Sequence, residues 1–172
     1  HIQLTLFHGQ PKSDKMETII QKTVELGVHE IVPVAMGRSI VKLDEKKSEK
    51  KHERWQSIAE SAAKQAGRGL IPKVKHVLYF DEAVRYASYL DAVIVPYESA
   101  ENIDYTRETI WNLDGCKSIG VFIGPEGGFT DEEISKASVH GFKIVTLGKR
   151  ILRTETAGMA AMAILGFVFE EN

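Results

Sequence analysis

The chain has 172 residues, of which 43% are hydrophobic and 27% are charged, and its formal net charge is −2. These values are typical of a globular domain, so they exclude a disordered or fibrous chain, and we expect one core over residues 1–172. Cys116 is the single cysteine, which excludes an internal disulfide framework and a zinc site built from cysteines. We find no apolar run of membrane-spanning length and no signal peptide, so we expect a soluble, cytoplasmic protein.

The first third of the chain predicts a strand, a helix and a second strand. Apolar residues alternate with polar ones from Ile2 to Leu6, and the segment 11–14 ends this strand. Asp14 and Glu17 have the spacing of a capping box. A helical apolar stripe follows and stops at Gly27; it contains Ile19, Ile20, Thr23, Val24 and Leu26. Residues 30–36 are predicted to form the second strand.

Residues 42–54 mix lysines with acidic residues. We interpret this segment as a solvated connection that leads into a helix, and the alternative is an RNA-binding tail. Helical spacing then begins at Trp55 and stops at Gly67, with Ile58, Ala59, Ala62, Ala63 and Ala66 on one face. We place Trp55 in the core, although an exposed tryptophan could instead stack on a base.

The rest of the chain alternates between two kinds of segment. β-rich runs at 73–80, 91–97, 117–124 and 142–148 are separated by segments near 81–90, 105–112 and 131–140 that can form helices. This alternation is typical of an α/β domain in which helices cover both faces of a parallel sheet. The last segment, 154–170, is apolar nearly all round. Such a helix must be buried against the sheet or against a second subunit.

Two glycine-bearing loops each follow an apolar strand: GPEGGF at 124–129 and LGKRILRTETA at 147–157. Parallel sheets bind ligands at the carboxyl ends of their strands, where both loops would lie. The alternative is ordinary turn chemistry. Thr130 and Glu133 form a capping box after the first loop, and the acidic residues 131–133 would repel a phosphate there. Phosphate-loop and dinucleotide motifs are also missing, so the loops favour a cofactor with a positive centre and no phosphate.

Several separated segments together resemble one known family. They are GPEGGFTDEEI, LGKRILRTETA, DKMETIIQKTVELGVHEIVPV, RSIVK and RWQSIAESAAKQAGR. They resemble the RsmE family of ribosomal RNA uridine-N3 methyltransferases, which belongs to the SPOUT superfamily, and the match spans nearly the whole chain. The resemblance implies a SPOUT-type α/β fold with a mostly parallel sheet and a C-terminal trefoil knot. It also implies S-adenosylmethionine (SAM) as cofactor, small-subunit ribosomal RNA as substrate and a homodimer.

Carried onto this sequence, the resemblance assigns both cofactor-binding and catalytic residues. The expected cofactor contacts are Pro96, Ile123, Gly124, Gly127, Leu147, Gly148, Ile151, Leu152 and Thr156. Methyl transfer to uridine N3 requires loss of a proton, so Arg153 is expected to stabilise the uracil anion or hold a phosphate, and Glu155 and Glu126 are the carboxylate candidates. Alternatively, Arg153 forms a salt bridge with Glu155, Glu126 accepts backbone N–H bonds, and Thr154 and Thr156 only cap the last helix. The six histidines show no metal-ligand spacing, so no metal is expected.

The charge of −2 gives little attraction to RNA phosphates. Arg38, Lys42, Arg68 and Lys73 are candidates for a basic patch or for plain solvated surface, and Arg150 for a phosphate contact. Family members usually begin with a PUA-like RNA-binding barrel, which has no counterpart here, and Gly37 replaces a usual acidic residue. We therefore expect weak RNA binding by this domain alone. Two other functions remain open: a SPOUT ribose 2′-O-methyltransferase acting on transfer or ribosomal RNA, and a non-catalytic RNA- or ribosome-binding module.

Overall fold

The computed structural model describes residues 1–39 and 44–169, and within them the chain forms seven strands and six helices. The strands are β1 (Gln3–Gly9), β2 (Glu30–Ala35), β3 (Lys73–Val74), β4 (Leu78–Tyr79), β5 (Ala92–Pro96), β6 (Ser118–Ile123) and β7 (Lys143–Val145). The helices are α1 (Lys15–Glu25), α2 (Glu45–Gln65), α3 (Phe80–Ala87), α4 (Ile103–Trp111), α5 (Asp131–Val139) and α6 (Thr154–Phe169). None of these helices has both the length and the apolar character to cross a bilayer.

All strand pairs are parallel, and the order in the sheet is β3-β2-β1-β6-β5-β7, with β4 also paired to β2. β1 is central and covered on both faces, so Thr5 and Phe7 on one face are buried as well as Leu4 and Leu6 on the other. The alternation of apolar and polar residues in the sequence suggests instead that only one face is buried. Pro33 has no N–H to donate, and it lies between the residues of β2 that pair with β3 and those that pair with β4. The predicted parallel α/β sheet is confirmed.

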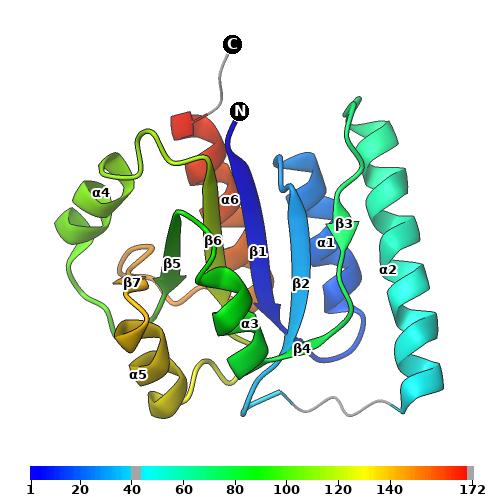
Figure 1. Ribbon diagram of the computed structural model, residues 1–172, viewed down its shortest axis with the longest axis horizontal. Helices are drawn as coiled ribbons and strands as arrows, with labels where there is room; N and C mark the ends of the chain where they lie inside the picture. Colours follow the sequence, from blue (N-terminus) through cyan, green and yellow to red (C-terminus); the bar gives the residue numbers. More distant parts are fainter. Residues whose placement is uncertain (40–43, 170–172) are drawn as a thin grey trace.

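Helices cover both faces of the sheet, as Figure 1 shows. α1, α2 and α6 pack on one face, where the core includes Leu6, Ile20, Trp55, Val121 and Leu165. On the other face α3 and α5 pack over a cluster that includes Phe7, Phe122 and Phe142. Trp55 is 5% exposed, which confirms it as a core residue. Each large side chain buried in this way contributes roughly 1.5–3 kcal/mol of hydrophobic stabilisation.

Several element boundaries differ from those predicted. α2 begins at Glu45, so most of the expected solvated connection is helical, because the Asp44 side chain accepts the Lys47 N–H and caps an exposed helical turn. The run 73–80 contains two short strands and the first residue of α3. The capping box expected at Asp14 does not form, since the Asp14 side chain makes no capping bond and Glu17 instead pairs with Arg54.

α6 is apolar nearly all round, but it is buried on one side only. Gly158, Ala161, Met162 and Leu165 face the sheet and α1. Phe167 is 90% exposed, and Ile164 is 38% exposed on the same outer side. The sheet and α1 therefore bury one face of α6, and the opposite face carries an exposed apolar stripe.

Candidate functional site

A cavity of about 390 Å³ lies at the carboxyl ends of β5, β6 and β7. Three loops form most of its wall, together with the adjoining ends of their strands and of α6: residues 96–98 at the end of β5, residues 123–129 at the end of β6, and residues 146–155 from β7 into the first turn of α6. Because the strands are parallel, all three loops leave the same edge of the sheet. The volume falls in the range of small-molecule sites.

The loop after β6 is a tight turn that packs closely on β1. The Gly128 N–H donates to the Pro125 carbonyl at 2.8 Å, and Gly128 has a φ of +73°, which favours glycine. A Cβ at Gly9 would lie 2.6 Å from Pro125 Cδ. The end of β1 and this loop can therefore approach only because Gly9 has no side chain. The capping box predicted for Thr130 and Glu133 is confirmed at the start of α5.

The loop after β7 is held by hydroxyl groups at both of its ends. Thr106 Oγ1 on α4 donates to the Thr146 carbonyl at 3.0 Å and accepts the Thr146 N–H. Thr154 Oγ1 donates to the Gly124 carbonyl at 2.5 Å. The Thr154 hydroxyl thus joins the two glycine loops instead of only capping α6.

The predicted cofactor residues gather at this cavity with one exception. Its wall includes Pro96, Ile123, Gly124, Gly127, Leu147, Gly148, Ile151 and Leu152. Thr156 is exposed on the first turn of α6 and is not part of the wall. Most of these residues carry no polar side chain, so a ligand here would meet apolar groups and backbone N–H and C=O groups.

Glu126 joins two loops through hydrogen bonds. Its Oε1 accepts the Lys12 backbone N–H at 2.8 Å and lies 3.4 Å from Lys15 Nζ. Partial burial acts to raise the pKa of Glu126, but the bonds from Lys12 and Lys15 outweigh it and hold the pKa below its usual value. The alternative in which Glu126 accepts a backbone N–H bond is therefore observed. Its carboxylate already interacts with Lys12 and Lys15.

Glu155 has a different environment, although it is close to the same lysine. Its Oε2 is buried and has no hydrogen-bond partner among the described residues, and Lys15 Nζ lies 3.9 Å away. Arg153 lines the cavity and is exposed. Within residues 1–39 and 44–169 it forms no ion pair with Glu155, so the structure does not contain the alternative salt bridge.

His8 is fully buried beneath the start of α6. Its Nδ1–H donates to the Gly9 carbonyl at 2.7 Å, and its Nε2 lies 3.4 Å from the Thr154 carbonyl. Burial lowers the pKa of His8 despite these bonds and the nearby charges of Glu126 and Glu155. The lowered pKa favours the neutral imidazole at pH 7. Gly158 lies against this ring, since a Cβ there would be 3.6 Å from His8 Cδ2.

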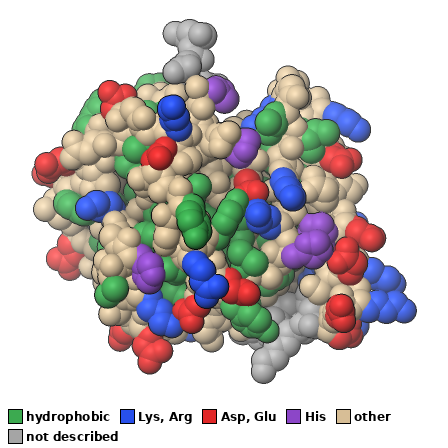
Figure 2. Space-filling view, viewed as in Figure 1, with side chains coloured by type: hydrophobic (Ala, Val, Ile, Leu, Met, Phe, Trp, Pro, Cys, Tyr) green, Lys and Arg blue, Asp and Glu red, His purple; other side chains and the backbone are tan. Residues whose placement is uncertain are grey.

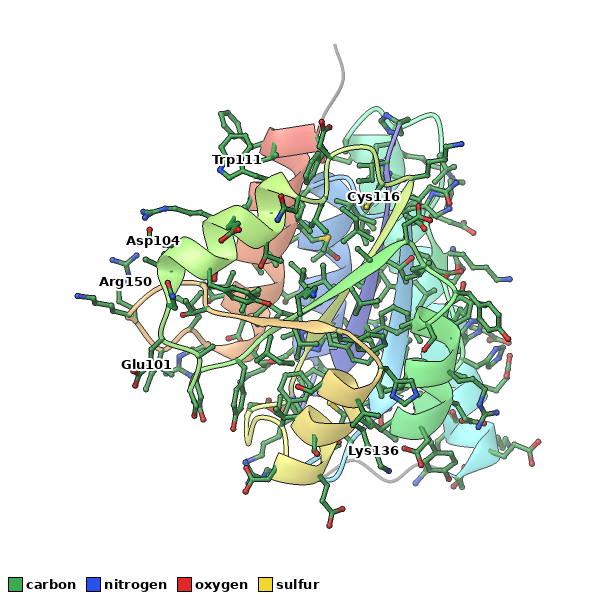
Figure 3. All side chains as sticks on the ribbon, turned by 60° about the vertical axis from the view of Figure 1, so that its left-hand side comes forward. Glu101, Asp104, Trp111, Cys116, Lys136 and Arg150 are labelled. Carbon is green, nitrogen blue, oxygen red and sulfur yellow. The ribbon has the colours of Figure 1, made fainter. Side chains whose placement is uncertain are left out.

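The candidate basic patch does not form as one surface. Arg38 donates to the Gly127 carbonyl at 2.8 Å, and Arg68 donates to the Val24 and Val28 carbonyls at the end of α1. Lys73 is exposed on β3, and Lys42 lies outside the described residues. On the face shown in Figure 2, basic and acidic side chains are interspersed. Figure 3 shows Arg150 at the outer edge of the loop after β7, with its side chain directed away from the sheet.

Two groups near the cavity could not be predicted from local sequence patterns. Lys15 is at the start of α1, and His8 is in β1, both more than a hundred residues before the glycine loops. Neither lies in a motif with a residue of those loops. Only the parallel pairing of β1 with β6 brings them to the site.

Comparison with known proteins identifies relatives over nearly the whole chain. A model of the RNA methyltransferase domain matches residues 1–166. The ribosomal RNA small subunit methyltransferase E of Bacillus subtilis is 38% identical over 98% of this chain, which spans 67% of that protein. The chain spans 62% and 54% of two further relatives with the same name, from Mesomycoplasma hyopneumoniae and a Synechocystis species.

Two solved structures are similar in fold and sequence. The Neisseria gonorrhoeae ribosomal RNA small subunit methyltransferase E, bound to S-adenosylmethionine, has a TM-score of 0.80 at 34% identity. A Legionella pneumophila methyltransferase in complex with SAM has a TM-score of 0.87 at 35% identity. In both cases the alignment covers 97% of this chain and 66% of the other.

Proposed function

We propose that this chain, which belongs to the RNA methyltransferase domain family, transfers a methyl group from SAM to N3 of a uridine in small-subunit ribosomal RNA. Its relatives are named ribosomal RNA small subunit methyltransferase E. The observation that carries this proposal is the cavity at the carboxyl ends of β5, β6 and β7. Two relatives with SAM bound have the same fold as this chain.

The residues of the cavity fit SAM chemically. SAM carries a positive sulfonium and no phosphate. The cavity wall combines glycine and apolar residues with three carboxylates, those of Glu98, Glu126 and Glu155, and four basic side chains, those of Lys15, Lys149, Arg150 and Arg153. The carboxylates can face the sulfonium, and the basic groups can face the substrate. Glu155 Oε2 is a buried acceptor at this wall that accepts no hydrogen bond from the described residues, and its ion pair with Lys15 is long, at 3.9 Å. We propose that residues 96, 123–128 and 147–152 hold the cofactor mainly through backbone groups.

When bound, SAM supplies the electrophilic methyl group, and the protein must position uridine N3 and take up its proton. Glu155 is our candidate proton acceptor, because Lys12 and Lys15 already occupy Glu126. The Arg153 guanidinium lies at the cavity without an ion-pair partner among residues 1–39 and 44–169, and it would stabilise negative charge that develops on the uracil ring. Glu126 then acts as a positioning residue that fixes the loop.

The other two functions have less support. Ribose methyltransferases of this superfamily tend to carry small polar residues in the last loop, whereas this chain has Arg153 and Glu155 there. A non-catalytic module would not need the two glycine loops to remain joined, as they are by Thr154. The names of the relatives also favour a methyltransferase that acts on small-subunit ribosomal RNA over a non-catalytic module and over a transfer-RNA substrate.

We predict that the chain binds SAM with micromolar affinity and that a chelator does not change this affinity. The physical reason is a cavity built from backbone groups and carboxylates without a need for metal. Calorimetric titration with and without a chelator measures the effect, and mass mapping of modified ribosomal RNA identifies the methylated base. Preferential binding of ATP or a nicotinamide dinucleotide would contradict the proposal.

The domain organisation and the knot remain predictions. We propose that residues 1–172 form one methyltransferase domain with a C-terminal trefoil knot. We also propose that the domain binds RNA weakly by itself, because Arg38 and Arg68 bind backbone carbonyls of their own chain and the net charge is −2.

We also propose a homodimer that buries the outer stripe of α6, which consists of Ala160, Ala163, Ile164 and Phe167. Phe167→Glu should then shift the chain toward monomer without unfolding it, because Phe167 is 90% exposed. Val139→Glu on α5, at a side chain 82% exposed, is the matched control. Light scattering at micromolar concentration measures the mass, and a monomeric parent chain would contradict the proposal. Met162 cannot serve in this test because it is buried in the core.

A further inference from the structure

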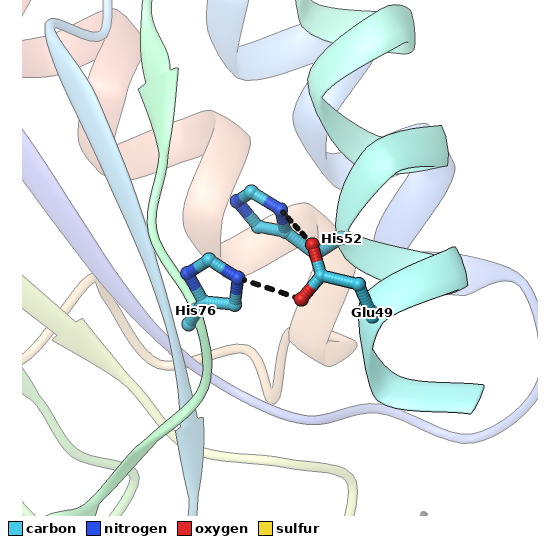
Figure 4. A group of neighbouring side chains, drawn as sticks. All are labelled: Glu49, His52 and His76. Atoms are coloured by element: carbon cyan, nitrogen blue, oxygen red, sulfur yellow. Dashed lines mark hydrogen bonds and ion pairs between the residues drawn. The ribbon is translucent and has the colours of Figure 1, made fainter. Parts of the chain in front are cut away.

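A second cluster of polar side chains lies at the β3 edge of the sheet, away from the cavity at β5, β6 and β7. It consists of Glu49 and His52 on α2 and His76 between β3 and β4, as Figure 4 shows. His76 Nε2 lies 3.1 Å from Glu49 Oε2, and His52 Nδ1 lies 4.0 Å from Glu49 Oε1. The ligand atoms of the three side chains all lie within 4.8 Å of one another.

The local structure prepares one imidazole as a ligand. Glu49 and His52 are three residues apart, so they lie on one face of α2. His52 Nε2 lies 2.8 Å from the Val74 carbonyl, which can only accept a hydrogen bond, so this nitrogen carries the proton. The lone pair is then on Nδ1, the atom that faces Glu49. Metal-binding histidines are commonly held in this way, with the second ring nitrogen donating to a backbone carbonyl.

We propose that Glu49, His52 and His76 bind one zinc ion. Two imidazole nitrogens and one carboxylate are a known zinc ligand set, whereas Mg²⁺ and Ca²⁺ prefer sites made of oxygen. The side chains of Glu49 and His76 are 55% and 64% exposed, so water can complete a four-coordinate site. This inference concerns a site separate from the cofactor cavity and does not depend on the proposed function.

The two histidine rings must move slightly to coordinate the ion. Their centroids are 3.8 Å apart and their planes differ by 16°, so the rings are stacked and their lone pairs run nearly parallel. A shared ion requires the planes to open toward it. The χ2 torsion of histidine is broad, and the His76 side chain is 64% exposed, so the His76 ring can rotate while His52 keeps its bond to Val74.

The bound ion would connect the first half of α2 to the edge of the sheet. Gln56 already joins them, since its amide donates to the Pro72 carbonyl and accepts the Val74 N–H. One helical turn earlier, His52 already bonds the Val74 carbonyl, and zinc would strengthen the contact of Glu49 and His52 with His76 there. If zinc binds the folded chain and not the unfolded chain, its binding stabilises the folded state by mass action.

Calorimetric titration of the metal-free chain with Zn²⁺ tests the proposal. We expect one saturable site, and we expect His76→Gln and Glu49→Gln each to weaken it on the order of tenfold or more. His140→Gln is the matched control, because His140 is exposed on the other side of the sheet. It should bind Zn²⁺ like the parent chain, and Mg²⁺ should not compete.

Thermal unfolding gives a second readout. Zn²⁺ should raise the Tm of the parent and His140→Gln chains and should not raise that of Glu49→Gln, a substitution that preserves side-chain shape. Absence of a saturable site would overturn the proposal. Unchanged zinc affinity in both His76→Gln and Glu49→Gln would also overturn it, because the ion would then be bound elsewhere on the chain.

Discussion

Arg153→Ala is expected to lower single-turnover methyl transfer to small ribosomal subunits by about 100-fold, while the affinity for SAM changes by less than about threefold. The reason is that the guanidinium has no ion-pair partner among the described residues and lines the cavity from the loop before α6. Its charge is therefore available to a developing anion. Loss of one preorganised donor at such a position costs roughly 2.7–4 kcal/mol of transition-state stabilisation.

Two variants make this test specific. Arg153→Lys keeps the positive charge but loses the planar fork, so it should recover part of the rate if the charge is what matters. Arg150→Ala removes a neighbouring arginine that also lines the cavity but whose side chain points away from the sheet (Figure 3), so it should lower methyl transfer less than Arg153→Ala does. Equal losses of SAM affinity and methyl transfer in Arg153→Ala would instead assign Arg153 to cofactor binding or to structure.

Gly9→Ala is expected to weaken SAM binding on the order of tenfold or more and to destabilise the fold by roughly 1–3 kcal/mol, the usual cost of overpacking. The new Cβ would lie 2.6 Å from Pro125 Cδ and 2.7 Å from Pro125 N, so the backbone of the 124–128 loop must shift. The Gly124 carbonyl that receives the Thr154 hydroxyl lies in the same loop. Two of the three loops that form the cavity wall should therefore be displaced.

Gly69→Ala is the matched control for this substitution. A Cβ at Gly69 meets no atom within 4 Å, and its φ is not in the left-handed region. This variant should retain both SAM affinity and stability. Calorimetry and denaturant unfolding provide the two measurements, and a Gly9→Ala chain that binds SAM as tightly as the parent would show that the loop position is not important for the cofactor.

The two capping boxes illustrate how far local sequence can predict structure. Thr130 and Glu133 form the predicted box, because Glu133 is buried and bonds both the Thr130 N–H and the Gly37 N–H. Asp14 and Glu17 have the same spacing and form none, because Glu17 pairs with Arg54 on α2. Spacing alone predicts which bonds are possible. The nearest competing partner in the fold decides which of them forms.

The sequence by itself determined the α/β class, the two glycine loops and, apart from the division of 73–80 into β3 and β4, the succession of strands and helices along the chain. Hydrophobic periodicity and turn chemistry act over a few neighbouring residues, so they can be read locally. The sequence also indicated the family, through motifs that are each contiguous. Only the tertiary structure decided that Lys15 contacts Glu126 and Glu155, that His8 is buried beneath α6, and that His76 meets Glu49. These contacts join residues that are distant along the chain. They depend on the strand order and on helix packing, which no local pattern of residues records.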